Sequence, residues 1–130
     1  MTSRHLSVAV PLPADTVYAY VRDARHLSEW AAGLSGIPFR QVDGAWTAQT
    51  PDGPLIIEFA ADNPHGVVDH WVITPDGTRT LNPMRVIPDG DGCEVVFTVR
   101  QRAGMSDDEF AADAGLVEAD LATLRRVLEG

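Results

Sequence analysis

Apolar and polar residues alternate at the start of the chain and again through its middle. In residues 4–11, Leu6, Val8 and Val10 alternate with His5, Ser7 and Ala9, and a period of two is typical of a strand with one buried face. Further along, several runs are rich in the β-branched and aromatic residues that favour strands. We predict strands at 37–42, 45–50, 54–61, 66–74, 78–87 and 93–102.

Turn residues separate these runs. Aspartate–glycine pairs occur at 43–44, 52–53, 76–77 and 89–90, and a longer turn is expected at 63–66. Glycine adopts the positive φ angles that tight hairpins need, and aspartate is favoured in turns. The strands should therefore form an antiparallel meander.

Polar residues within two of the runs predict which face is buried. Glu58 in one run, and Glu94, Thr98 and Arg100 in another, should point outward. The residues expected to point inward are Leu55, Ile57, Phe59, Val95, Phe97 and Val99. A slip of one residue in register would invert each assignment.

Helical spacing marks two other parts of the chain. Apolar residues three and four apart predict a short helix that includes Asp15 and Val21, and a second through 25–33. At the other end, Ser106 and Glu109 fit a capping box that starts a long helix. Its apolar stripe recurs at spacings of four and three: Phe110, Ala114, Val117, Leu121, Leu124 and Leu128.

One residue of this long segment conflicts with a helix. Gly115 lies in its middle, where glycine costs about 1 kcal/mol relative to alanine. Two explanations are open: the glycine permits close approach of the sheet, or it leaves space for a ligand.

The order of elements predicts one α+β domain over residues 1–130, of the helix-grip type. In this architecture a curved antiparallel sheet of about seven strands wraps a long C-terminal helix, because one apolar helix stripe needs one apolar sheet face. Two short helices follow the first strand. The length of 130 residues suits a single domain.

Composition narrows the possible partners and compartments. The net charge of -9 disfavours binding to nucleic acid or to anionic membranes. The chain has no apolar run of about 20 residues that would span a membrane and no signal peptide, so we expect a cytoplasmic protein. Cys93 is the one cysteine and cannot form an internal disulfide.

Four stretches together resemble the SRPBCC superfamily of START and Bet v 1-like domains, in particular its small bacterial polyketide cyclase/dehydrase-like members. They are VAVPLPADTVYAYVRDARHLSEW (8–30), GVVDHWV (66–72), NPMRVIPDGDGCEVVFTV (82–99) and GMSDDEFAADAGLVEADLATLRRVLEG (104–130). The resemblance implies a domain that holds lipids, polyketides, hormones or other hydrophobic molecules between sheet and helix. Some members are cyclases, and others act as chaperone cofactors or have no known activity.

Asp69 and His70 are the candidate catalytic residues. They are neighbours in a predicted strand, so they should point to opposite faces, and one of them should face the interior. An interior histidine can exchange protons or orient a ligand carbonyl. The alternative is a histidine that is hydrogen-bonded in the core, or a pair that faces solvent.

Aromatic and apolar residues are the candidate ligand contacts. The tryptophans could line a hydrophobic pocket and stack on a flat ligand; the alternative for them is core packing or, for one of the three, an exposed edge. The candidates are Trp30, Trp46, Phe59, His70, Trp71, Met84, Phe97 and Val117. Arg85 stands between Met84 and Val86, and we expect it to be solvated unless the register is reversed.

Motifs for metals, cofactors and nucleophiles are missing. The histidines are scattered, and the pair His26 and Glu29 on one helix is too few ligands for a metal. Asp89–Gly90–Asp91–Gly92 lacks the remaining ligands of a calcium loop. Cys93 has no evident base beside it and is interpreted as a small apolar core residue. We expect no metal and no cofactor.

Three functions fit this sequence. The first is binding of a small hydrophobic molecule, lipid-like or polyketide-like, between the sheet and the C-terminal helix. The second is a cyclase or dehydratase that acts on a polyketide-like substrate with His70 or Asp69 as acid or base. The third is an interaction or co-chaperone-like domain without catalysis. The protein is expected to be a monomer or a homodimer.

Overall fold

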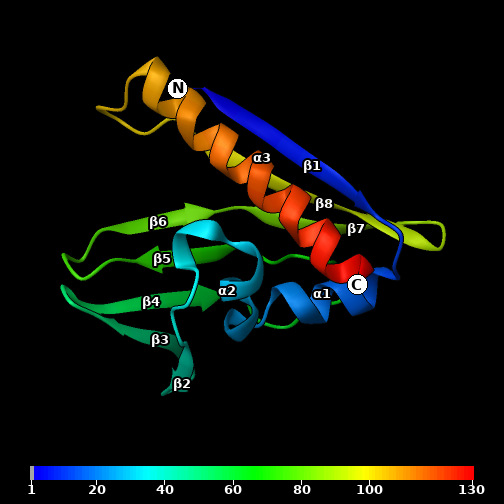
Figure 1. Cartoon of the computed structure of the whole chain (residues 1–130), viewed down its shortest axis with the longest axis horizontal. Helices are drawn as coiled ribbons and strands as arrows, with labels where there is room; N and C mark the ends of the chain where they lie inside the picture. Colours follow the sequence, from blue (N-terminus) through cyan, green and yellow to red (C-terminus); the bar gives the residue numbers. More distant parts are fainter. Residues whose placement is uncertain (1) are drawn as a thin grey trace.

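A computed structural model of the chain describes residues 2–130 and has the expected α+β architecture (Figure 1). The strands are β1 (Ser3–Val10), β2 (Arg40–Val42), β3 (Ala45–Thr50), β4 (Gly53–Phe59), β5 (His70–Ile73), β6 (Arg79–Asn82), β7 (Met84–Asp89) and β8 (Gly92–Arg100). The helical elements are α1 (Ala14–Val21), η1 (Ala24–His26), α2 (Leu27–Trp30), η2 (Ala32–Leu34) and α3 (Asp107–Glu129).

All strand pairs are antiparallel and fall into two ladders, β1-β8-β7 and β2-β3-β4-β5-β6. The ladders join beside β5, where Val67 bridges Arg85. There the N–H of Val68 donates to the carbonyl of Met84 over 2.9 Å. The run 78–87, predicted as one strand, is two strands with Pro83 between them, because proline has no N–H to give to a ladder. If β6 and β7 are counted as one bent strand, the sheet has the expected seven strands.

The close approach that joins the ladders requires a glycine. Gly66 has a φ of +70°, and a Cβ built on it would lie 2.1 Å from the carbonyl oxygen of Val86. The N–H of Val86 donates to the Gly66 carbonyl over 2.9 Å. Any side chain at this position would push the two strands apart.

Three further predicted elements differ from the structure. The strand predicted at 66–74 covers only β5, His70–Ile73, and Val67 before it forms an isolated bridge. The strand predicted at 37–42 covers only 40–42, since Pro38 cannot donate to the ladder, and Phe39 is instead buried in the core. The helix predicted through 25–33 is divided into η1, α2 and η2, and the break between α2 and η2 falls at Ala31, which has extended backbone angles (φ -96°, ψ 103°).

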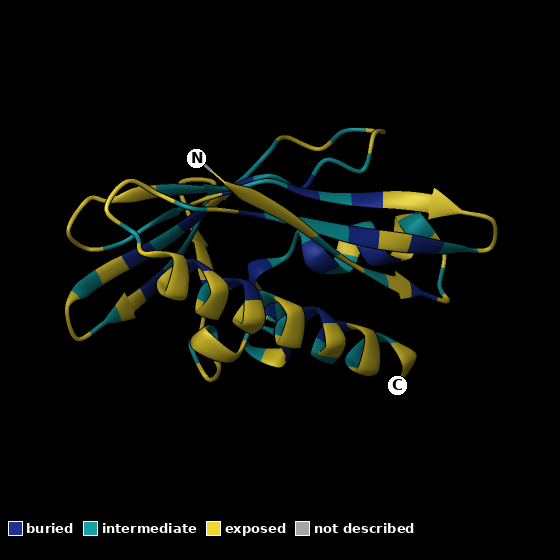
Figure 2. Cartoon of the chain, turned by 90° about the horizontal axis from the view of Figure 1, so that it is seen from above, coloured by how far each residue is buried: buried dark blue, intermediate teal, exposed yellow. Residues whose placement is uncertain are grey.

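The long helix matches its prediction. The N–H of Glu109 donates to Oγ of Ser106, and the N–H of Ser106 donates to Oε1 of Glu109, each over 3.1 Å. The predicted stripe is buried or half-buried along its whole length, and α3 turns this side toward the sheet (Figure 2). Gly115 is exposed, and a Cβ built on it would meet nothing within 4 Å. Of the two explanations left open for Gly115, close approach of the sheet is therefore wrong.

The sheet faces also match their prediction. Leu55, Ile57, Val95 and Val99 are buried, and Phe59 and Phe97 are half-buried. Helix α3 packs against β1, β8 and α2 (Figure 1), which places it over one half of the sheet. The inner face of β5 and β6 is consequently less covered than that of β1 and β8.

Candidate functional site

A cavity of about 440 Å³ lies between the sheet and the N-terminal half of α3. We call it the sheet–helix pocket. Strands β5, β6 and β8 supply one side, and Asp113 and Val117 of α3 supply the other. Its lining residues are Val72, Arg79, Thr80, Leu81, Asn82, Phe97, Val99, Arg100, Gln101, Arg102, Asp113 and Val117.

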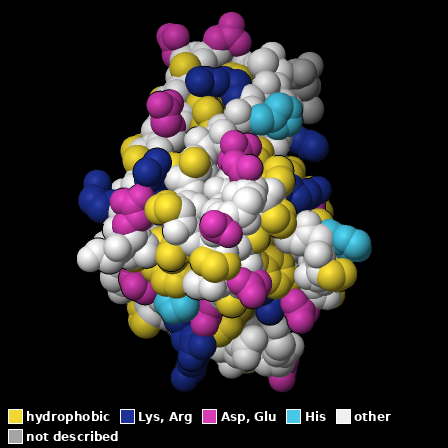
Figure 3. Space-filling model, turned by 90° about the vertical axis from the view of Figure 1, so that its right-hand side faces the viewer, with side chains coloured by type: hydrophobic (Ala, Val, Ile, Leu, Met, Phe, Trp, Pro, Cys, Tyr) yellow, Lys and Arg dark blue, Asp and Glu magenta, His cyan; other side chains and the backbone are white. Residues whose placement is uncertain are grey.

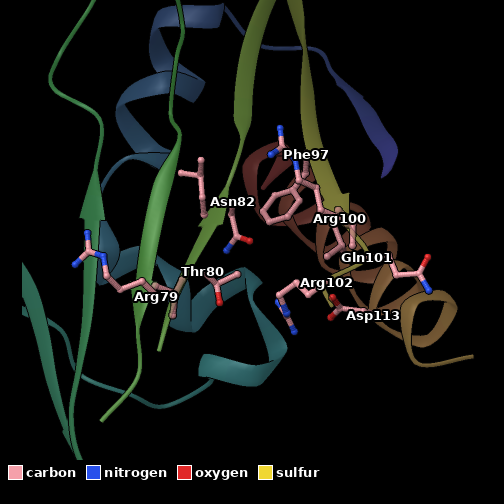
Figure 4. A pocket seen from close by; sticks show the side chains of 12 residues that line it. Arg79, Thr80, Asn82, Phe97, Arg100, Gln101, Arg102 and Asp113 are labelled. Atoms are coloured by element: carbon pink, nitrogen blue, oxygen red, sulfur yellow. The ribbon is translucent and has the colours of Figure 1, made fainter. Parts of the chain in front are cut away.

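The inner part of this pocket is mostly apolar. Val72, Phe97 and Val99 come from the inner faces of their strands, and Val117 belongs to the buried stripe of α3. The ring of Phe97 and the amide of Asn82 point into the same space (Figure 4). A ligand would therefore meet apolar walls with an amide at one edge.

Charged residues lie toward the opening. Arg102 and Asp113 both line the pocket (Figure 4), and Arg102 is exposed whereas Asp113 is half-buried. Arg79 points away from the pocket, where its guanidinium lies 5.0 Å from the ring centroid of Trp71. Gln101 is held by hydrogen bonds to the carbonyl of Met105 and to Asp107.

His70 is buried directly behind the pocket wall. It pairs with Asn82 in the β5–β6 register, and its ring centroid lies 6.0 Å from that of Phe97 and 5.3 Å from that of Phe59. Its Nδ1 lies 3.0 Å from the carbonyl oxygen of Val68. A carbonyl only accepts, so Nδ1 carries the proton and Nε2 of the neutral ring is an acceptor.

Burial keeps this histidine neutral. Desolvation lowers the pKa of His70 below its usual 6.5, although the Val68 carbonyl and the charge of Asp69 oppose the shift. A protonated ring would lie among apolar side chains without a carboxylate in direct contact.

Asp69 faces the other side of the sheet, as alternation requires. Its carboxylate accepts from the N–H of Met84 over 2.9 Å and pairs with the guanidinium of Arg85. Asp69 therefore does not adjoin the pocket. The sequence suggested that Arg85 is simply solvated, but its guanidinium pairs with Asp69.

The sequence candidates are only partly brought together. Phe97 and Val117 line the sheet–helix pocket, and His70 adjoins it. Trp46 and Phe59 border a separate recess of about 350 Å³ beside α1. Trp30 and Met84 are buried in the core. Trp71 is on the outer face and 37% exposed, which removes it from the pocket wall.

Sequence reasoning missed Thr80 and Asn82. Both face inward because they alternate with Arg79 and Leu81 on β6. Asn82 pairs with His70 and therefore faces the same side of the sheet. The sequence alone does not give this β5–β6 register, so it could not have identified Asn82 as a pocket residue.

Other kinds of site lack support within the described residues. No group of three or more His, Cys, Asp or Glu among residues 2–130 is placed to hold a metal ion. The thiol of Cys93 is buried, which raises its pKa and makes it a poor nucleophile. None of the helices described here has the length and apolar character to cross a membrane.

Acidic side chains are spread over the surface. On the end of the molecule in Figure 3 they are scattered among hydrophobic side chains, in keeping with the net charge of -9.

Fold and sequence together place the chain in a class of sheet-and-helix proteins that enclose a pocket. The chain belongs to the family described as polyketide cyclase / dehydrase and lipid transport, whose model matches residues 1–129. This confirms the resemblance to the SRPBCC superfamily. Comparison with curated proteins gave no match.

Solved structures share the fold at low identity. An uncharacterised protein from Bacillus thuringiensis is 14% identical, with a TM-score of 0.72 over 99% of this chain and 100% of that one. The Aha1 dimer from Colwellia psychrerythraea is 12% identical, with a TM-score of 0.71 over 99% and 97%. Truncated norcoclaurine synthase from Thalictrum flavum is 17% identical, with a TM-score of 0.60 over 98% and 92%.

Proposed function

We propose that the protein binds a small hydrophobic molecule, lipid-like or polyketide-like, in the sheet–helix pocket. The observation that carries this proposal is the cavity of about 440 Å³, which has apolar walls and lies between the sheet and α3. Ligand pockets in proteins typically measure about 300–1,000 Å³ and have apolar walls with a few polar groups. Family membership supports hydrophobic ligand binding in general.

The site of binding is tested with a neutral dye that fluoresces in apolar surroundings, N-phenyl-1-naphthylamine. Replacing Val117 by phenylalanine adds volume to the pocket wall, whereas Leu116 is 63% exposed and does not line this pocket. We expect wild type and L116F to enhance the fluorescence equally. V117F should bind the dye on the order of tenfold more weakly, equivalent to about 1.4 kcal/mol.

Both variants are first checked for cooperative unfolding. Equal affinities of V117F and L116F would show that the dye binds elsewhere. No fluorescence gain with wild type, together with a native mass spectrum of the purified protein that shows no bound molecule, would overturn the proposal.

A further inference from the structure

Two polar side chains meet on the inner face where β5 and β6 pair. His70 and Asn82 stand opposite each other in the register, and Nδ2 of Asn82 lies 3.5 Å from Nε2 of His70. His70 is only 7% exposed, while Asn82 is half-buried and lines the sheet–helix pocket.

The lone pair of His70 Nε2 is weakly used. Nδ1 has its own partner at 3.0 Å, the carbonyl of Val68. The contact between Nε2 and Asn82 is longer than the 2.7–3.2 Å typical of a good hydrogen bond. Phe59 and Phe97 flank the ring and offer no donor. A buried acceptor without a good donor is destabilising, so a ligand that supplies one gains affinity.

We propose that the pocket selects ligands that carry an alcoholic or phenolic hydroxyl group on an apolar body. The hydroxyl donates its hydrogen to Nε2 of His70 and accepts from the Nδ2–H of Asn82. The apolar body lies against Phe97, Val99 and Val117. This inference rests on the proposed function, because it concerns the same pocket.

Other polar groups match these two side chains less well. A ketone or ether oxygen has no hydrogen to give to Nε2, and a carboxylate would bring negative charge to a lone pair. An ammonium group cannot accept from the Asn82 amide. A hydroxyl group both donates and accepts, so one such group can serve the acceptor Nε2 of His70 and the donor Nδ2–H of Asn82.

The test compares two probes of nearly equal shape, 4-propylphenol and 4-propyltoluene. Each displaces N-phenyl-1-naphthylamine from the wild-type protein and from three variants. H70F keeps an aromatic ring but removes the acceptor, and N82L removes the donor. T47V is the control, because Thr47 is a polar strand residue on β3 that does not line this pocket.

The measured quantity is the ratio of the two affinities. We expect the preference for the phenol to fall about tenfold in H70F and by several-fold in N82L, because a site built for a hydroxyl discriminates against analogues without it. T47V should keep the wild-type ratio. Circular dichroism verifies the fold of each variant, and N82L decides the matter if H70F does not fold.

The outcomes separate this inference from the proposed function. A ratio that is unchanged in both H70F and N82L, while both probes still displace the dye, would overturn the hydroxyl selection and leave the binding function standing. If neither probe displaces the dye from the wild type, hydroxyl selection is also wrong.

Discussion

At the scale of single residues, Asp69 and His70 show how an extended segment directs two neighbouring ionisable side chains to opposite faces of the sheet. Asp69 points outward to a guanidinium and a backbone N–H, while His70 points inward to a carbonyl and two aromatic rings. Alternation predicted this separation, but it did not predict which residue would be inside. That choice depends on the neighbouring strands, whose register no local pattern reveals.

The buried histidine makes stability depend on pH. Its folded-state pKa is lowered, chiefly by desolvation, whereas the unfolded chain takes up a proton near 6.5. The unfolded state therefore binds more protons as the pH falls below about 6.5, and the free energy of unfolding should decrease from there toward the lower folded-state pKa. Urea unfolding at pH 7.5, 6.5 and 5.5 measures this decrease.

The variant H70F isolates this contribution. Other charges near the pocket, Asp69 behind the strand and Arg102 and Asp113 at the opening, are the same in both proteins. Between pH 7.5 and 5.5, wild type should lose more of its free energy of unfolding than H70F does. Parallel curves would show that His70 is protonated equally easily in both states.

At the scale of elements, α3 was the most predictable because its signals are local. The capping box and the apolar stripe lie within one segment, and both are present. The region from Arg79 to Asp89 was less predictable, because the bend at Pro83 serves pairing with strands on both sides. His70 and Trp71 were both candidate ligand contacts, but neighbouring residues of a strand point to opposite faces of the sheet. Only one of the two could therefore face the pocket.

Replacing Gly115 tests the helix directly. Its Cβ would meet nothing within 4 Å, and its φ is not in the left-handed region, so alanine fits without strain. We expect G115A to raise the free energy of unfolding by about 1 kcal/mol, since alanine has the higher helix propensity. Urea denaturation at neutral pH measures the change.

Gly104 is the matched control. Its Cβ would also meet nothing within 4 Å, but its φ is +84°, which L side chains rarely adopt. G104A should therefore lower the free energy of unfolding by about 1 kcal/mol. If G115A and G104A change the free energy of unfolding equally, backbone conformation does not determine the effect of alanine at these two positions.

At the scale of the whole molecule, the sequence predicted the architecture better than the pocket. Strand pattern, turns and the helix stripe define a sheet wrapped around a helix. The position of the pocket depends on α3 lying over β1 and β8, which leaves β5 and β6 to form its other wall. Such an offset is set by the packing of all elements together. The sequence candidates consequently omit Thr80, Asn82 and Arg102 of the pocket lining, and they include Trp71, which lies on the outer face.

The junction of the two ladders holds this curved sheet together. At the junction the carboxylate of Asp69 accepts from the N–H of Met84 and from the guanidinium of Arg85, next to the bridge between Val67 and Arg85. Removing the carboxylate in D69A leaves a half-buried N–H without its partner and a guanidinium without its counterion. We expect D69A to lose about 1–2 kcal/mol in free energy of unfolding, a value reduced by partial exposure to solvent.

The same variant should also weaken binding, because β5 and β6 on one side of the junction and β8 on the other share the pocket wall. Glu58 offers the control: it pairs with Arg79 at 3.7 Å on the exposed face of the sheet, and E58A should cost less than about 1 kcal/mol. Urea denaturation and dye titration of both variants test the argument. If D69A is destabilised but binds the dye as wild type does, the junction stabilises the sheet without shaping the pocket. If D69A and E58A unfold alike, Asp69 contributes no more than an ordinary surface ion pair, and the two ladders are held together by their backbone hydrogen bonds alone.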